Sequence, residues 1–102
     1  MARPIRCGII QASCDLHADR HPLEKIKKQM IEKHVALVRE AAKKGVQILG
    51  LQELFYGPYF CAEQQARWYE LTERVPGGPT LALMQKLSKQ HRMAMIVPVY
   101  EQ

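Results

Sequence analysis

Apolar residues along the chain recur in two patterns, one typical of helices and one of buried strands. Between residues 23 and 44 they recur every three or four positions, which is the spacing of one helical face. These positions are Leu23, Ile26, Met30, Leu37, Val38 and Ala41. His34 fills the gap in this stripe and is expected to be a partly buried, hydrogen-bonded histidine. Pro22 can begin the helix and Gly45, which follows two lysines, can end it.

Two apolar runs of strand length flank this helix, at residues 5–11 and 46–51. The second run is apolar almost throughout, which is typical of a strand covered on both faces, as in a parallel sheet. Residues 5–51 therefore predict a strand–helix–strand unit, which is nearly always parallel and right-handed.

The second half of the chain adds a loop, two helices and a strand. Residues 52–64 form an aromatic loop, residues 64–73 a short helix, and residues 75–79, Val-Pro-Gly-Gly-Pro, a break. Thr80 is expected to cap a helix that runs to about residue 92. A third strand follows at residues 93–100. The predicted class is α/β with the order β-α-β-loop-α-α-β.

Two helices can barely cover both faces of a three-stranded sheet, and parallel sheets need cover on both sides. Residues 1–102 are therefore expected to be part of a longer protein or of a larger assembly.

Charge and composition narrow the possible partners. The net charge is +5, from 15 Lys and Arg against 10 Asp and Glu. The positive charges of residues 24–44 are interspersed with Glu24, Glu32 and Glu40, as on a solvated helix face, so nucleic-acid binding is not expected. No apolar run approaches the roughly 20 residues of a membrane helix or the length of a signal peptide, so no membrane partner is expected.

Cysteine usage points to a reducing compartment. The chain has three cysteines, Cys7, Cys14 and Cys61, which cannot all pair with one another. An odd number without a secretion signal predicts reduced thiols and a cytoplasmic protein. Cys7 lies in the first strand and is expected to be a small buried apolar residue.

The residue that stands out as a candidate for chemistry is Glu53. Ligands of open α/β sheets bind beyond the carboxyl ends of the strands, and the second strand leads there to Glu53. Four aromatic residues follow within residues 55–60. Apolar rings around the carboxylate would desolvate it, as suits a general base, so Glu53 is expected to be mostly buried with Phe55 or Tyr59 close to it. The residues alone equally allow Glu53 to be a helix-capping or salt-bridge residue and the aromatic rings to be core.

Other constellations carry weaker signals. Cys61 lies in a loop without a nearby His, which disfavours a nucleophile. Cys14, His17 and His21 could reach one metal ion, but no fourth ligand is evident, and a polar loop is preferred. The glycine patterns of dinucleotide and phosphate loops are missing. No metal or cofactor is predicted.

A resemblance to a known family adds to this interpretation. Residues 48–61, ILGLQELFYGPYFC, resemble the first catalytic segment of the nitrilase (carbon–nitrogen hydrolase) superfamily. The opening strand IRCGIIQASCD, the helix end REAAKKGVQIL and the stretch VPGGPTLALMQKLSKQHRMAMIVPVYE resemble the segments that surround it. The resemblance covers essentially all of residues 1–102 and is nearest to the β-ureidopropionase and N-carbamoyl amidohydrolase branch.

The resemblance implies a fold, a reaction and partners. The fold would be the N-terminal part of a four-layer α-β-β-α sandwich, and residues 1–102 a partial domain. The reaction would use a Glu–Lys–Cys constellation without a cofactor, on a small N-carbamoyl or amide compound. Glu53 would be the Glu, and Phe55 and Tyr59 would line the substrate pocket. The Lys and Cys of the family lie beyond residue 102, so the chain alone is expected to be inactive. The family also implies a homo-oligomer or association with the rest of the same chain.

Two function classes remain open from the sequence. One is a carbon–nitrogen hydrolase that acts on N-carbamoyl-β-alanine or a related compound, of which this chain carries the Glu. The alternative is a non-catalytic α/β module for binding or assembly, derived from the same fold.

Overall fold

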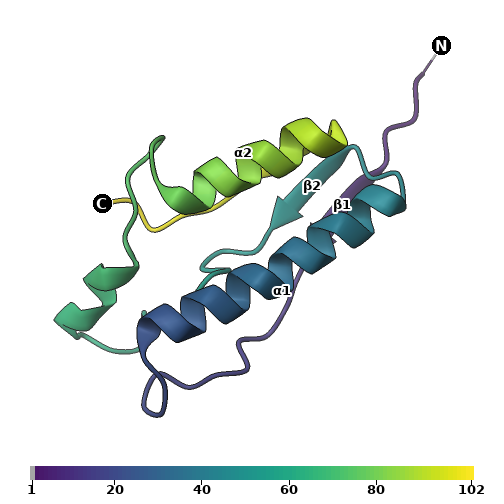
Figure 1. Ribbon diagram of the computed structural model, residues 1–102. Helices are drawn as coiled ribbons and strands as arrows, with labels where there is room; N and C mark the ends of the chain where they lie inside the picture. The colour runs from purple at the N-terminus through teal and green to yellow at the C-terminus, as the bar shows by residue number, and fades with distance from the viewer. Residues whose placement is uncertain (1) are drawn as a thin grey trace.

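The computed structural model describes residues 2–102 and confirms the α/β class and the predicted order of elements (Figure 1). The elements are β1 (Cys7–Ile10), α1 (Leu23–Lys43), β2 (Ile48–Leu51), the 3-10 helix η1 (Ala66–Leu71), α2 (Pro79–His91) and β3 (Ala94–Ile96). Each strand is shorter than its apolar run, because only three or four residues of each run pair with a neighbouring strand.

The three strands form one parallel sheet in the order β1-β2-β3. Ile9 pairs with Gly50, which in turn pairs with Ile96. The crossovers through α1 and α2 advance in the same direction along the sheet, so both helices lie on the same face of it. Figure 1 shows α1 and α2 side by side along the strands, and contacts between the two helices agree with this view.

The core lies between this helical layer and the covered face of the sheet. Helix α1 contributes Ile26, Met30 and Val38, all fully buried, at the spacing predicted from the sequence. Met84 of α2 and Leu49 of β2 complete the centre of the cluster. Burying such apolar side chains is the main favourable contribution to folding.

The opposite face of the sheet has no cover within the described residues. Ile9 is 85 % exposed, Ile96 63 % and Ile48 40 %. The prediction that both faces of the second strand are covered is therefore wrong for residues 2–102. Cys7 also lies on this face and is exposed, which corrects the prediction that it is buried. None of the three cysteines is in a disulfide in the structure.

The start of α2 differs from the prediction. The helix begins at Pro79, with Gly78 at the N-cap position, and Thr80 lies within its first turn. Thr80 is therefore not the cap, and its hydroxyl donates to the carboxylate of Glu73 instead. Among the described residues no helix combines the length and apolar character needed to cross a membrane.

Candidate active site

Glu53 lies two residues beyond the end of β2, at the carboxyl end of the central strand. The predicted position of Glu53 in the fold is therefore confirmed. Its side chain is exposed in this chain, so the prediction that it is mostly buried is wrong for the described residues.

The backbone after Glu53 explains this exposure. Leu54 adopts a positive φ of 56° and turns the chain sharply, and the amide of Gly57 donates to the carbonyl of Leu54 at 3.3 Å. The turn directs Phe55 and Tyr56 into the core, where both are buried. A left-handed conformation costs a residue other than glycine about 1–2 kcal/mol. Such local strain clusters at functional sites, which agrees with a role for Glu53.

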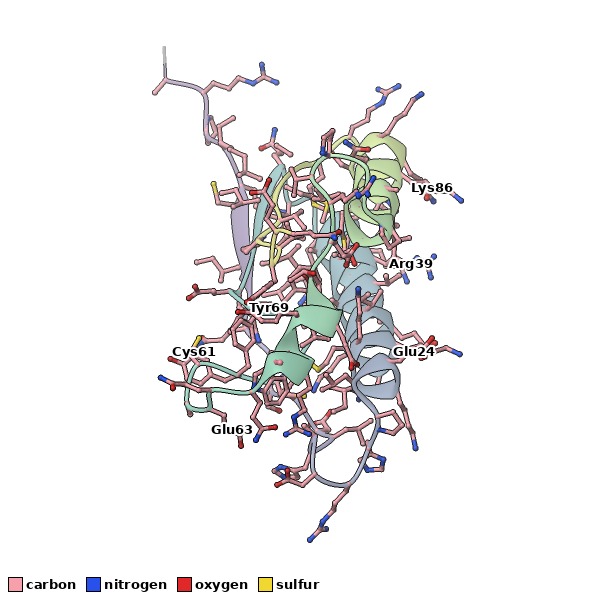
Figure 2. The ribbon with its side chains drawn as sticks, turned by 90° about the vertical axis from the view of Figure 1, so that its left-hand side faces the viewer. Glu24, Arg39, Cys61, Glu63, Tyr69 and Lys86 are labelled. Atoms are coloured by element: carbon pink, nitrogen blue, oxygen red, sulfur yellow. The ribbon has the colours of Figure 1, made fainter. Side chains whose placement is uncertain are left out.

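Glu53 opens onto a cleft of about 790 Å³. This volume is within the range of small-molecule sites. The other lining residues are Leu54, Phe60, Cys61, Tyr69, Thr72, Pro98, Val99, Tyr100, Glu101 and Gln102. They come from the loop after β2, from the end of η1 and from the segment after β3. In Figure 2, Cys61 and Tyr69 lie on the side of the molecule opposite Glu24 and Arg39 of α1.

The two residues expected to line a substrate pocket, Phe55 and Tyr59, do not line this cleft. Phe55 is fully buried, with its ring 5.1 Å from the ring of His34 on α1, so it is a core residue. Tyr59 is 72 % exposed and does not line the cleft. Phe60, which the sequence placed in the same aromatic loop, is the ring that lines it.

Gln52 fixes the strand end that carries Glu53. Its side-chain amide donates to the carbonyl of Ala12 at 2.7 Å, and its carbonyl oxygen accepts from the amide of Ala12. These two bonds continue the pairing of β1 and β2 beyond Ile10 and Leu51. Glu53 is therefore attached to a strand end held by its neighbour.

Tyr56 joins two segments that line the cleft. Its hydroxyl donates to the carbonyl of Leu71 and accepts from the amide of Tyr100, each at 2.9 Å. Burial raises the pKa of Tyr56, while the hydrogen bond from Tyr100 opposes the rise. The hydroxyl therefore stays protonated at neutral pH and serves as donor and acceptor at once.

Glu73 is a buried carboxylate behind the same wall of the cleft. It is 5 % exposed, forms an ion pair with Lys27 of α1 at 2.8 Å and accepts from the backbone amide and the hydroxyl of Thr80. Burial alone would raise the pKa of Glu73, but the bonds from Lys27 and Thr80 outweigh it and lower the pKa. The carboxylate thus links α1 to the positive N-terminal end of α2.

Sequence reasoning did not single out Gln52, Tyr56 or Glu73. Glu73 precedes a Pro- and Gly-rich break and a helix, and a carboxylate just before a helix start is a usable signal. No local signal identifies Tyr56, because its partners lie 15 and 44 residues away in the chain.

The fold does not assemble a metal site from the other candidate residues, Cys14, His17 and His21. Within residues 2–102 no three His, Cys, Asp or Glu side chains are placed to hold one metal ion. Cys14 instead donates to the carbonyl of Leu16. Cys61 lines the cleft with Glu53, and no His side chain lines it. Two carboxylates, those of Glu53 and Glu101, line the cleft, and none of its lining residues in the described chain is a Lys or Arg.

Comparison with known proteins places this chain in a family. The carbon-nitrogen hydrolase family matches residues 11–102. An N-carbamoylputrescine amidase of Arabidopsis thaliana is 43 % identical over 63 residues, 62 % of this chain and 20 % of the relative. One from Oryza sativa subsp. japonica is 39 % identical over 66 residues, 65 % of this chain and 22 % of the relative. A beta-ureidopropionase of Arabidopsis thaliana is 31 % identical over 99 residues, 97 % of this chain and 24 % of the relative.

The parallel sheet and the match over residues 11–102 define an α/β domain of the type found in carbon-nitrogen hydrolases. The chain belongs to the carbon-nitrogen hydrolase family, the nitrilase superfamily, and corresponds to its N-terminal part. The stretches that match cover about a fifth to a quarter of the length of these curated relatives.

Proposed function

We propose that this chain provides the general base of a carbon–nitrogen hydrolase that acts on small N-carbamoyl or amide compounds. The observation that carries the proposal is the position of Glu53, at the carboxyl end of the central strand and on the wall of a cleft of substrate size. N-Carbamoyl compounds are favoured as substrates because the relatives include an N-carbamoylputrescine amidase and a beta-ureidopropionase.

The chemistry follows the Glu–Lys–Cys pattern that the family implies. Glu53 takes the thiol proton of a cysteine, and the thiolate attacks the carbamoyl carbon to give a tetrahedral oxyanion that a lysine stabilises. The C–N bond to the terminal nitrogen breaks, and ammonia leaves with the proton held by Glu53. Water, activated by Glu53, then hydrolyses the thioester and restores the thiol. The released carbamate takes up a proton and loses carbon dioxide to give the amine.

The lysine and the nucleophilic cysteine are expected outside residues 1–102. Glu53 and Glu101 but no Lys line the cleft in the described chain, which supports this expectation for the lysine. Further chain or a partner would also enclose Glu53, which the described residues leave exposed. The four-layer arrangement and a cytoplasmic location are parts of the same proposal.

A chimaera tests the function. Residues 1–102 replace the matching segment of the Arabidopsis beta-ureidopropionase, whose match covers 97 % of this chain. Release of ammonia from N-carbamoyl-β-alanine is then measured. We expect activity, and a loss of at least about a thousandfold for Glu53→Gln, because general base and nucleophile act as one unit. Glu70→Gln, an exposed acid on η1, is the matched control and should leave activity unchanged.

The isolated chain provides the second half of the test. Purified residues 1–102 should release no ammonia above background. Ammonia release by the isolated chain that Glu53→Gln abolishes would show that the missing lysine and cysteine are not required. A folded chimaera whose activity is insensitive to Glu53→Gln would favour the non-catalytic module instead.

A further inference from the structure

Tyr56 is a core residue whose hydroxyl bonds to the two chain segments that line the cleft together with the Glu53 loop. The ring is buried, with 3 % of its surface exposed. The carbonyl that it bonds belongs to Leu71, next to Thr72 in the cleft wall. The amide that it accepts from belongs to Tyr100, which itself lines the cleft.

The ring of Tyr56 is held on two sides, so the hydroxyl has little freedom. The ring of Phe55 meets it edge-on with centroids 5.3 Å apart, and Nζ of Lys27 lies 4.9 Å from its centroid. Aromatic contacts and cation–π contacts of this kind each favour one ring position. The hydroxyl is therefore a fixed point between the wall segments.

The same two wall segments are also joined by their backbones, next to the Tyr56 hydroxyl. The amide of Glu73 donates to the carbonyl of Tyr100 at 2.8 Å, and the amide of Gln102 donates to the carbonyl of Glu73 at 2.9 Å. Tyr100 thus has its carbonyl bonded to Glu73 and its amide bonded to Tyr56. Without the hydroxyl, the amide of Tyr100 and the carbonyl of Leu71 would both lose the partner that the fold gives them.

We propose that Tyr56 is a positioning residue, whose hydroxyl fixes the separation between the Glu53 loop and the cleft wall formed by residues 71–72 and 98–102. This inference rests on the proposed function, because it assigns the hydroxyl a purpose in presenting Glu53 to a substrate. Tyr56 follows Glu53 by three positions, and the chain between them turns sharply at Leu54, so movement of Tyr56 is transmitted to Glu53. A small misplacement of a catalytic group lowers turnover more than it lowers binding.

Tyr56→Phe tests the bonds directly, because it removes the hydroxyl and keeps the ring. In the 102-residue chain we expect amide hydrogen exchange at Tyr100 to become about tenfold faster, as expected for the loss of one hydrogen bond. Exchange in the middle of α1 should be unchanged. Ser88→Ala is the matched control, because it removes a hydroxyl-to-carbonyl bond of 2.6 Å to Met93 away from the cleft. Unchanged exchange at Tyr100 in Tyr56→Phe would overturn the inference.

The unsubstituted chain gives a measurement that does not depend on how a variant folds. The hydroxyl proton of Tyr56 should exchange slowly with water and show a nuclear Overhauser effect to the amide proton of Tyr100. A rapidly exchanging hydroxyl without this contact would overturn the inference.

Kinetics of the chimaera separate positioning from a structural role. For Tyr56→Phe we expect kcat to fall about tenfold with KM within twofold, consistent with the loss of correct presentation of the base. Replacing Tyr56 by 4-aminophenylalanine, which keeps a donor and a lone pair, should restore most of kcat. An unchanged kcat would overturn the inference, even where Glu53→Gln abolishes activity and so supports the proposed function.

Discussion

At the scale of single residues, His34 is a titratable side chain enclosed in the core. It is fully buried in the middle of α1, and its Nδ1 donates to the carbonyl of Met30 at 2.8 Å. Its Nε2 has no hydrogen-bond partner among the described residues. Burial lowers the pKa of His34, and Lys33 lowers it further, while the bond to Met30 opposes them. The fold therefore favours the neutral form of the His34 imidazole.

This arrangement predicts a loss of stability in weak acid. Because the pKa of His34 is lower in the folded chain than the 6.5 of an unfolded one, unfolding takes up a proton. The free energy of unfolding should be constant above about pH 7 and should fall below pH 6.5, by at most about 1.4 kcal/mol per pH unit. His34→Leu should abolish this slope between pH 7 and 5, measured by urea denaturation. His17→Leu, at an exposed position, should retain it, and an equal slope in His34→Leu would contradict the assignment.

At the scale of elements, the chain leaves both α1 and α2 through a residue in the left-handed conformation, but the residue types differ. Gly45 follows α1 with a φ of 76°, and Arg92 follows α2 with a φ of 51°. Both positions are left-handed, a conformation that glycine adopts without steric cost and that other residues adopt at a cost of about 1–2 kcal/mol. The Gly45 position also lies near Arg6, whose guanidinium would be 3.3 Å from an added Cβ.

Removing the glycine after α1 and introducing one after α2 should therefore change the free energy of unfolding in opposite directions. Gly45→Ala should lower the free energy of unfolding by about 1 kcal/mol, and Arg92→Gly should raise it by about 0.5–1 kcal/mol. Chemical denaturation at pH 7 measures both, with Lys89→Gly inside α2 as a control that should destabilise. A destabilising Arg92→Gly would show that the side chain of Arg92 contributes more than the backbone strain costs.

The helices and the order of the elements could be predicted because their signals are local. The apolar stripe that includes Ile26, Met30 and Val38 and the break before Pro79 depend on neighbours within one or two turns. The position of Glu53 followed equally from the apolar run before it. The exposure of Glu53 could not be predicted, because it depends on the left-handed turn at Leu54. A leucine gives no sequence signal for that conformation. The bonds from Tyr56 to Tyr100 join distant segments, and no periodicity encodes such pairs.

At the scale of the whole molecule, the described chain is elongated, with extents of 52 × 26 × 21 Å. Its radius of gyration is 14.7 Å, against about 13 Å for a compact domain of this size. Its helices cover one face of the sheet, and the other face presents Ile9, Ile48 and Ile96 in adjacent strands. The curated relatives that it matches are about three to four times as long.

This uncovered face predicts that the chain associates. Contiguous apolar patches are uncommon on monomers, and the open edges of β1 and β3 invite pairing with another strand. We expect sedimentation velocity at micromolar concentration to show self-association, little weakened by the net charge of +5, because salt at physiological strength screens charges beyond about 8 Å. Ile9→Lys should shift the chain toward the monomer with its free energy of unfolding nearly unchanged, because Ile9 contacts solvent in the isolated fold. Val75→Lys, in an exposed loop, should leave association as it was. A monodisperse parent chain that unfolds cooperatively would contradict the prediction and would mean that one covered face is enough to stabilise this sheet.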